Sequence, residues 1–212
     1  MILKQTRSND SLTIKKCVFV TLTQDVEHWK AILGKLNVNP AKAIEEGSLV
    51  FVDLFSKWRS TKPGADGDIL GNIHKVLANN TETASPGETL VMIDDLAHLS
   101  WVGVDELDLL KFIRTLRLTL HESALLIGCH TLAVEPPTSI IHRYLLETCT
   151  VHLEFRPLTS GRSGLVSGEL IVCRGPEAWP EDITIPAQNT LHYRSTDSGA
   201  IIFEKGSSVV LT

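Results

Sequence analysis

Glu88-Thr-Leu-Val-Met-Ile-Asp-Asp-Leu-Ala-His-Leu99 is the stretch of sequence that decides the fold. Its apolar run, Leu90 to Ile93, follows Pro86-Gly87 and ends in two adjacent carboxylates, Asp94 and Asp95. A short apolar run bounded in this way is typical of a strand buried on both faces of a parallel α/β sheet. Ligands of such sheets bind at the carboxyl ends of the strands, where an acid of the nucleotide hydrolases holds magnesium. The stretch therefore predicts a metal–phosphate site or the remnant of one.

Strand and helix patterns alternate outward from this stretch. We expect buried strands at 16–22, 48–54, 89–95 and 123–129, and helices at 25–36, 41–46, 68–78, 104–121 and 139–147, with a polar loop at 56–67. After Thr148 the pattern becomes hairpins, with strands at 148–156, 168–173, 190–194 and 200–204. This order predicts an α/β three-layer fold with a mostly parallel central sheet, which the antiparallel C-terminal hairpins extend at one edge. It resembles a RecA-type core, with a polar segment at 1–15 and one domain at 16–212.

Composition narrows the class of protein. The 212 residues carry a net charge of −5 at a pI near 5.9, which gives no indication of a nucleic-acid-binding protein. The four cysteines form no C-x-x-C pair, and the eight histidines show no metal-ligand spacing. No apolar segment reaches the length of a membrane span, and the N-terminus lacks the apolar core of a signal peptide. We therefore expect a soluble, intracellular protein with reduced cysteines and no metal or other cofactor.

The sequence has no phosphate-binding P-loop. That motif, G-x-x-x-x-G-K-[ST], must follow a strand so that backbone N–H groups can surround the phosphates. The one Gly-Lys pair, Gly34-Lys35, lies inside a predicted helix and is followed by Leu36, and Trp29 stands where the first glycine is needed. Without this loop, two interpretations of Asp94 and Asp95 remain. They activate a metal or water, or they cap backbone N–H groups of the following segment, which is the interpretation that we favour.

Other candidate sites are less specific. Cys129-His130 ends a predicted strand, but adjacent strand residues point to opposite faces, so the two side chains are not expected to meet. A small-molecule enzyme using Asp94, Asp95 and His130 ranks last among the functional hypotheses, because no nucleophile and base are visibly paired. Basic residues beside an aromatic ring can contact RNA, although a solvated loop is the commoner explanation. The residues of this kind are Lys57, Arg59 and Lys62 around Trp58, with Arg162 as a weaker candidate.

Several segments, in this order and spacing, resemble the Elongator complex protein 6 family. They are Val20–Trp29, Leu33–Val38, Glu46–Val52, Leu90–Leu96, Val102-Gly103, Leu158–Gly161, Ser167–Leu170 and Ile202–Gly206, which together span nearly the whole chain. The resemblance implies a RecA-like fold that has lost its nucleotide-binding motifs. Asp94 and Asp95 then correspond to a degenerate Walker B-like pair.

The same resemblance implies partners and a process. Family members form a hetero-hexameric ring with the similar subunits 4 and 5, and the ring is an accessory part of Elongator beside core subunits 1 to 3. Elongator modifies the wobble uridine of certain transfer RNAs, which bind through the assembled ring and are released on ATP hydrolysis. The implied role of this subunit is structural, without catalytic, cofactor or metal residues and without a membrane, in the cytoplasm and also the nucleus. An arginine of one subunit can act on a nucleotide held by the next, and Arg143 and Arg156 are the possible donors.

Two points stay open in the sequence. Many relatives carry a further strand, turn and helix before the position of Lys16–Leu22, whereas only fifteen mostly polar residues stand there in this chain. Either the sheet lacks a strand or the sequence is short at this end. The alternative to a non-catalytic subunit is a divergent RecA-like NTPase that binds ATP through an atypical phosphate loop.

Overall fold

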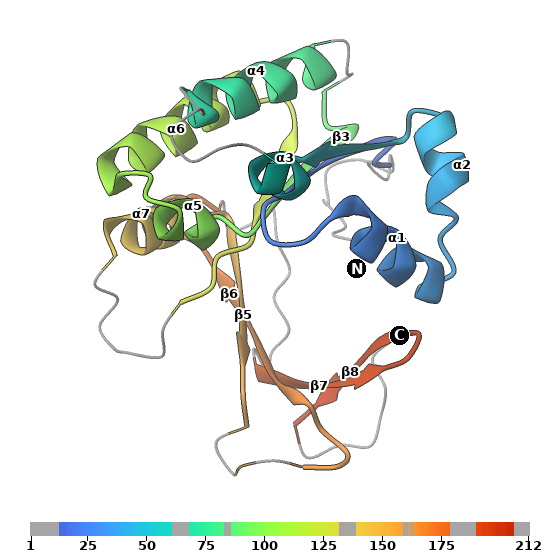
Figure 1. Ribbon diagram of the computed structural model, residues 1–212. Helices are drawn as coiled ribbons and strands as arrows, with labels where there is room; N and C mark the ends of the chain where they lie inside the picture. The colour runs from blue at the N-terminus through green and yellow to red at the C-terminus, as the bar shows by residue number, and fades with distance from the viewer. Residues whose placement is uncertain are drawn as a thin grey trace. The chain divides into compact units, whose positions relative to one another are not determined.

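The structure is a computed structural model that describes residues 13–60, 68–82, 86–131, 139–158, 161, 163–178 and 190–205 (Figure 1). The side chains of residues 59 and 60 lie outside this description. The chain divides into two compact units. One comprises the described chain up to Gly34 together with Val38–Arg143, and the other comprises Lys35–Asn37 and the described chain from Tyr144 on. Among the described residues, every helix is too short or too polar to cross a membrane.

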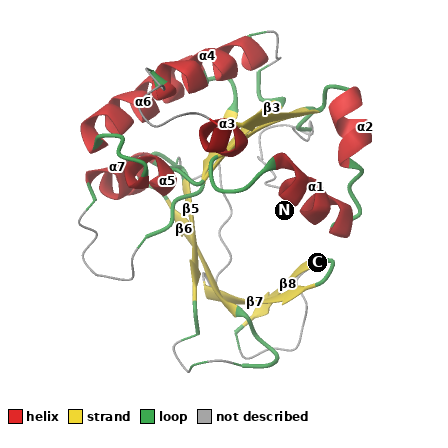
Figure 2. Ribbon diagram, viewed as in Figure 1, coloured by secondary structure: helices red, strands yellow, loops and turns green. Residues whose placement is uncertain are grey.

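The first unit is built on a four-stranded parallel sheet. Its strands are β1 (Lys16–Thr21), β2 (Leu49–Asp53), β3 (Thr89–Asp94) and β4 (Ala124–Ile127), in the order β2-β1-β3-β4. Figure 2 draws the strands in yellow and labels β3 of this sheet. The predicted strand at 89–95 is confirmed as β3, and it pairs with β1 on one side and β4 on the other. Val18, Val20 and Val91 are completely buried, as expected for central strands covered on both faces.

Helices cover both faces of this sheet. The two helices α4 (Ile69–Thr81) and α6 (Glu106–Thr119) run side by side over one face (Figure 1). They bury Ile73 and Leu77 of α4, and Leu109, Phe112, Ile113 and Leu116 of α6. On the other face, α1 (Val26–Lys35) places Trp29 edge-on against Phe19, with the ring centroids 4.7 Å apart. The short α2 (Pro40–Glu45) begins at a proline and precedes β2. These layers confirm the predicted three-layer α/β arrangement.

Two short helices occur where the sequence predicted other structure. The predicted polar loop at 56–67 is wrong in its first part, because α3 (Leu54–Ser60) begins directly after β2. The Asp53 carboxylate accepts a hydrogen bond from the Ser56 amide at 2.8 Å and so starts the helix at the strand end. The predicted helix at 104–121 begins later, at Glu106, and a separate α5 (Ala97–Trp101) precedes it. Gly103, with φ of 95°, separates the two helices.

The second unit carries an antiparallel sheet. After α7 (Ile140–Thr148), which spans the boundary, come β5 (Val151–Arg156), β6 (Gly168–Arg174), β7 (Thr190–Thr196) and β8 (Gly199–Glu204). They pair consecutively in the order β5-β6-β7-β8, so the predicted hairpins are confirmed. The expectation that they extend an edge of the parallel sheet is wrong. Within the part of the chain that the structure describes, these four strands pair with one another and form a separate antiparallel sheet.

A charged cluster ties three strands of this second sheet together. The Glu169 carboxylate lies 2.9 Å from Lys205 Nζ and 3.7 Å from His192 Nε2. The hydrogen bond from Lys205 lowers the pKa of Glu169 below its ordinary value. The cluster links β6, β7 and the residue that follows β8.

Candidate functional site at the carboxyl edge of the parallel sheet

The ends of β3 and β4 bring the predicted acids next to His130. Ile93 pairs with Ile127 in the sheet, so the residues that follow each strand lie beside one another. Two backbone hydrogen bonds extend this pairing beyond the strands. They run from Gly128 N to Ile93 O at 2.8 Å and from Leu96 N to Gly128 O at 2.9 Å. The carboxyl edge of the sheet, where ligands of α/β folds bind, therefore carries Asp94, Asp95 and His130 together.

Asp95 is almost completely buried, and its carboxylate is occupied by hydrogen bonds. Its side chain is 1% exposed and accepts from the His130 backbone amide at 3.1 Å and from the Ala97 amide at 3.0 Å. It also pairs with His130 Nδ1. A buried carboxylate facing Nδ1 favours the tautomer with the proton on that nitrogen. The His130 ring itself is 79% exposed, so a buried carboxylate orients an imidazole that solvent reaches.

Asp94 has a different environment from its neighbour. Burial raises its pKa above the ordinary carboxyl value, and the charge of Asp95 raises it further. The charge of His130 and a hydrogen bond from the Thr23 side chain act in the opposite direction. A Cβ on Gly128 would stand 3.1 Å from Asp94 Oδ1, so glycine at this position leaves room for the carboxylate. The peptide bond between Asp94 and Asp95 is cis.

The Cys129 thiol does not join this cluster as a nucleophile. Burial, followed by the charge of Asp95, raises its pKa to about 11, which keeps it protonated at neutral pH. Its sulfur lies 4.0 Å from the backbone oxygen of His130, while the His130 ring pairs with Asp95. The expectation that Cys129 and His130 do not pair through their side chains is confirmed. The bond between His130 and Asp95 was not predicted from the sequence.

Acids at the other strand ends hold backbone amides. Asp53 caps α3, and Asp25, after β1, accepts from the His28 amide at 2.8 Å. For Asp95, the prediction that a strand-end acid caps the following segment is confirmed by its bond to the Ala97 amide. Among the described residues, no group of three or more His, Cys, Asp or Glu side chains is arranged to hold a metal ion.

The predicted basic residues lie elsewhere. Lys57 is exposed on α3 rather than on a loop, and Trp58, next to it, stacks on His98 at 6.0 Å between ring centroids. Arg143 lies on α7, and on β5 Arg156 pairs with Glu154 at 2.5 Å. The Arg59 side chain, Lys62 and Arg162 lie outside the described residues. The structure therefore brings together Asp94, Asp95 and His130 of the residues singled out in the sequence.

Comparison with solved structures identifies the fold. A KaiC-like protein of the archaeon Pyrococcus horikoshii OT3 is similar at a TM-score of 0.61 and 12% identity, over 89% of this chain and 76% of that one. An uncharacterised Pyrococcus horikoshii protein, solved with an unknown peptide, is similar at a TM-score of 0.60 and 12% identity, over 91% and 81%. The chain has a RecA-like fold. No protein-family model matches the sequence, and no curated protein does.

Proposed function

We propose that this chain is a non-catalytic RecA-like subunit of the Elongator accessory ring, which supports wobble-uridine modification of transfer RNA. The observation that carries the proposal is a RecA-like fold whose 212-residue sequence contains no G-x-x-x-x-G-K-[ST] motif. The choice of family rests on the segments that resemble Elongator complex protein 6, in order from Val20–Trp29 to Ile202–Gly206.

The arrangement around Asp95 supports a role without catalysis. In a nucleotide hydrolase, the acid at this strand end holds magnesium together with nucleotide phosphates. Here the carboxylate is buried and accepts hydrogen bonds from His130 and Ala97 instead. A magnesium ion at Asp95 would have to displace those bonds. The proposal therefore assigns Asp94 and Asp95 to structure, as the remnant of a Walker B-like pair.

The proposed partners are Elongator subunits 4 and 5 in a hetero-hexamer and core subunits 1 to 3 around it. The ring, in the cytoplasm and also the nucleus, would bind transfer RNA. Within this proposal Lys57, Arg59 and Lys62 contact the RNA, with Arg162 as a further contact. Arg143 and Arg156 are the residues that would reach a nucleotide of a neighbouring subunit. Alanine at both should then lower ring-dependent ATP hydrolysis.

Co-expression with subunits 4 and 5, followed by mass measurement of the purified complex, tests the proposal directly. We expect a hexamer that contains this chain. A stable monomer that stays separate from both partner subunits would overturn the assignment. Calorimetry of the isolated chain with ATP and Mg²⁺ tests the alternative of a divergent NTPase. Saturable binding that Asp94→Ala weakens would establish that alternative, and an absence of binding heat would remove it.

The RNA contact has its own test in the assembled ring. Charge reversal at Lys57, Arg59 and Lys62 should weaken transfer-RNA binding and flatten its salt dependence. With fewer phosphate contacts, binding releases fewer counterions from the RNA. Reversal of Lys42, a lysine on α2 that lies 3.6 Å from Glu46, is the matched control. Unchanged RNA affinity and salt slope in the triple variant would exclude this surface from the RNA path.

A further inference from the structure

Three aromatic side chains form a continuous strip across α3 and α5. The Trp58 ring stacks on the His98 ring at 6.0 Å between centroids, with an interplanar angle of 17°. The His98 ring also contacts Trp101, with the ring centroids 6.0 Å apart, in an edge-to-face arrangement. Trp58 and His98 are half-buried, whereas Trp101 is 68% exposed. The strip therefore ends in a tryptophan whose large apolar ring is open to solvent.

Further apolar side chains are exposed close to Trp101 in the chain. Val102 is 48% exposed and Leu107, at the start of α6, is 56% exposed. A compact turn joins α5 to α6, with hydrogen bonds from Gly103 N to Ser100 O and from Val104 N to Leu99 O, each at 3.0 Å. We call the surface made by Trp101, Val102 and Leu107 the α5–α6 corner. Exposed apolar residues this close together in the chain make the corner a candidate protein interaction site.

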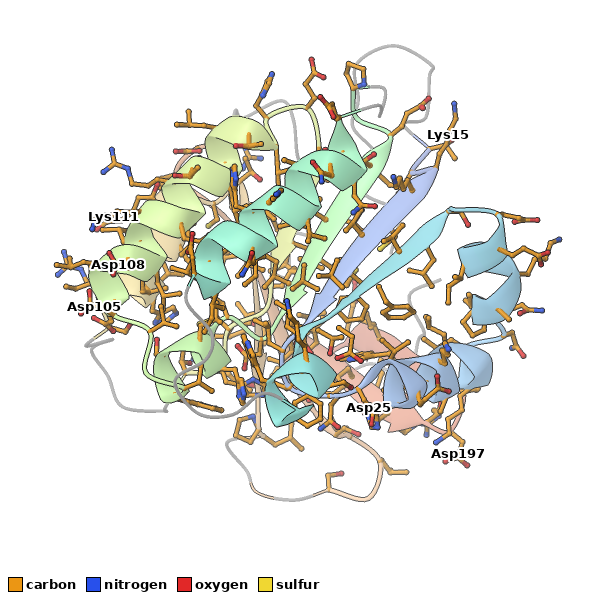
Figure 3. The ribbon with its side chains drawn as sticks, turned by 45° about the horizontal axis from the view of Figure 1, so that its top comes forward. Lys15, Asp25, Asp105, Asp108, Lys111 and Asp197 are labelled. Atoms are coloured by element: carbon orange, nitrogen blue, oxygen red, sulfur yellow. The ribbon has the colours of Figure 1, made fainter. Side chains whose placement is uncertain are left out.

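Acidic side chains border the α5–α6 corner. Asp105, Glu106 and Asp108 lie within the turn and the first residues of α6, and Figure 3 shows Asp105 and Asp108 at the same end of that helix as Lys111. Asp108 pairs with Lys111 at 2.7 Å, and Asp105 accepts from the Leu107 amide at 2.8 Å. Lys111 offsets the charge of Asp108, whereas the carboxylates of Asp105 and Glu106 leave negative charge beside the corner. Such a charge attracts a cationic partner and repels the phosphates of a nucleic acid.

We propose that the α5–α6 corner binds an arginine-bearing segment of a partner protein. A guanidinium group stacks on the exposed face of Trp101 by cation–π attraction, and its N–H donors reach the carboxylates of Asp105 or Glu106. Arginine fits better than lysine, because its planar group can stack and donate several hydrogen bonds at once. The proposal rests on the described contacts alone and does not depend on the Elongator assignment.

The test uses a blocked peptide with three arginines separated by glycines, and a matched peptide with three lysines. Titration of the whole chain is followed through the indole N–H signal of Trp101 in NMR spectra, which Trp101→Phe identifies by its loss. We expect the arginine peptide to shift this signal and to bind more tightly than the lysine peptide. Trp101→Ala should weaken its binding by about two- to fivefold, the range expected for an exposed cation–π contact.

Charge variants distinguish binding at the α5–α6 corner from a general attraction of cationic peptides to this negatively charged protein. Asp105→Asn keeps an N-cap side chain while removing the charge, and should weaken binding of the arginine peptide. Asp197→Asn removes the same charge from the turn between β7 and β8 and should leave binding unchanged. Equal affinity for the two peptides, or unchanged affinity in Trp101→Ala, would overturn the proposal. So would a uridine decamer that shifts the Trp101 signal where the arginine peptide does not, because the corner would then be an RNA-stacking surface.

Discussion

The Asp95 carboxylate and His130 are bound to each other across thirty-five positions of the chain, through both the backbone amide and the ring Nδ1 of the histidine. Asp95 follows β3 and His130 follows β4, so this pair fastens the ends of two neighbouring parallel strands. The carboxylate is buried while the imidazole is largely exposed. The buried Asp95 carboxylate thus anchors the segment that follows β4.

Removal of the Asp95 carboxylate should destabilise the protein strongly. Asp95→Ala removes a buried carboxylate and leaves the partly buried amides of Ala97 and His130 without their acceptor. We expect the free energy of unfolding to fall by about 3 kcal/mol, as for other buried charged hydrogen-bond partners. Urea denaturation followed by circular dichroism measures this. Asp53→Ala, which removes one exposed helix cap, is the control and should cost about 1 kcal/mol. Equal losses in the two variants would contradict the anchoring role.

The charge of Asp94 should lower the stability of the folded protein, whereas the Asp95 carboxylate raises it. Its pKa is raised in the folded chain, so the folded state binds the proton more tightly than the unfolded state. Stability is then highest where the carboxyl is protonated, and falls as the pH rises from the ordinary value of 3.8 through the raised pKa. Asp94→Asn cannot ionise and escapes this loss. We therefore expect the variant to match the natural protein at low pH and to exceed its stability at pH 7.

Denaturant titrations at a series of pH values check this difference. The variant Asp25→Asn is a suitable comparison, because Asp25 is an exposed helix cap after a neighbouring strand. If Asp94→Asn were instead less stable than the natural protein at pH 7, with the deficit shrinking as the pH falls, the folded state would favour the charged carboxylate and the prediction would be wrong.

The sequence predicted the layers of this fold but missed its local turns and its key contact. Alternating strand and helix periods identified β1 to β4 and their order along the chain, since buried parallel strands are continuous apolar runs. The α3 helix was missed because its residues after Phe55 are mostly polar, and the cap that starts it comes from Asp53 at the preceding strand end. The predicted long helix also began two residues early, at 104, and the short α5 before it was not predicted.

The bond between Asp95 and His130 was missed for a different reason. It depends on which strands are neighbours, and the chain order alone leaves that undetermined. The available signal was that Asp95 ends one predicted buried strand and His130 directly follows another. The two could therefore meet only if β3 and β4 are adjacent, as they are in the sheet. Distant side-chain pairs of this kind need the sheet order before they can be recognised.

Cys129 should react slowly with alkylating reagents. At pH 8, about one in a thousand thiols with a pKa of about 11 is ionised to the thiolate. The thiolate fraction of an unperturbed cysteine is far larger at this pH. We expect alkylation by iodoacetamide to be about a hundredfold slower than that of free cysteine. Mass spectrometry of the peptide that carries Cys129 measures the rate separately from the other cysteines. Asp95→Asn should speed the reaction, because the charge of Asp95 helps to raise this pKa. A rate matching free cysteine would refute the assignment of a buried, protonated thiol.

Two glycines should respond oppositely to replacement by alanine. A Cβ on Gly175 would stand 1.9 Å from the backbone oxygen of Cys149, so the chain after β6 must move away from α7's end to accommodate it. We expect Gly175→Ala to lower the free energy of unfolding by about 2 kcal/mol or more. Gly34 lies within α1 with nothing inside 4 Å of the added carbon, and Gly34→Ala should stabilise by about 0.5–1 kcal/mol through helix propensity. Urea midpoints of both variants, with Gly164→Ala as a replacement in open space, test the pair. Tolerance of alanine at Gly175 would mean that the backbone of Cys149 does not approach it closely.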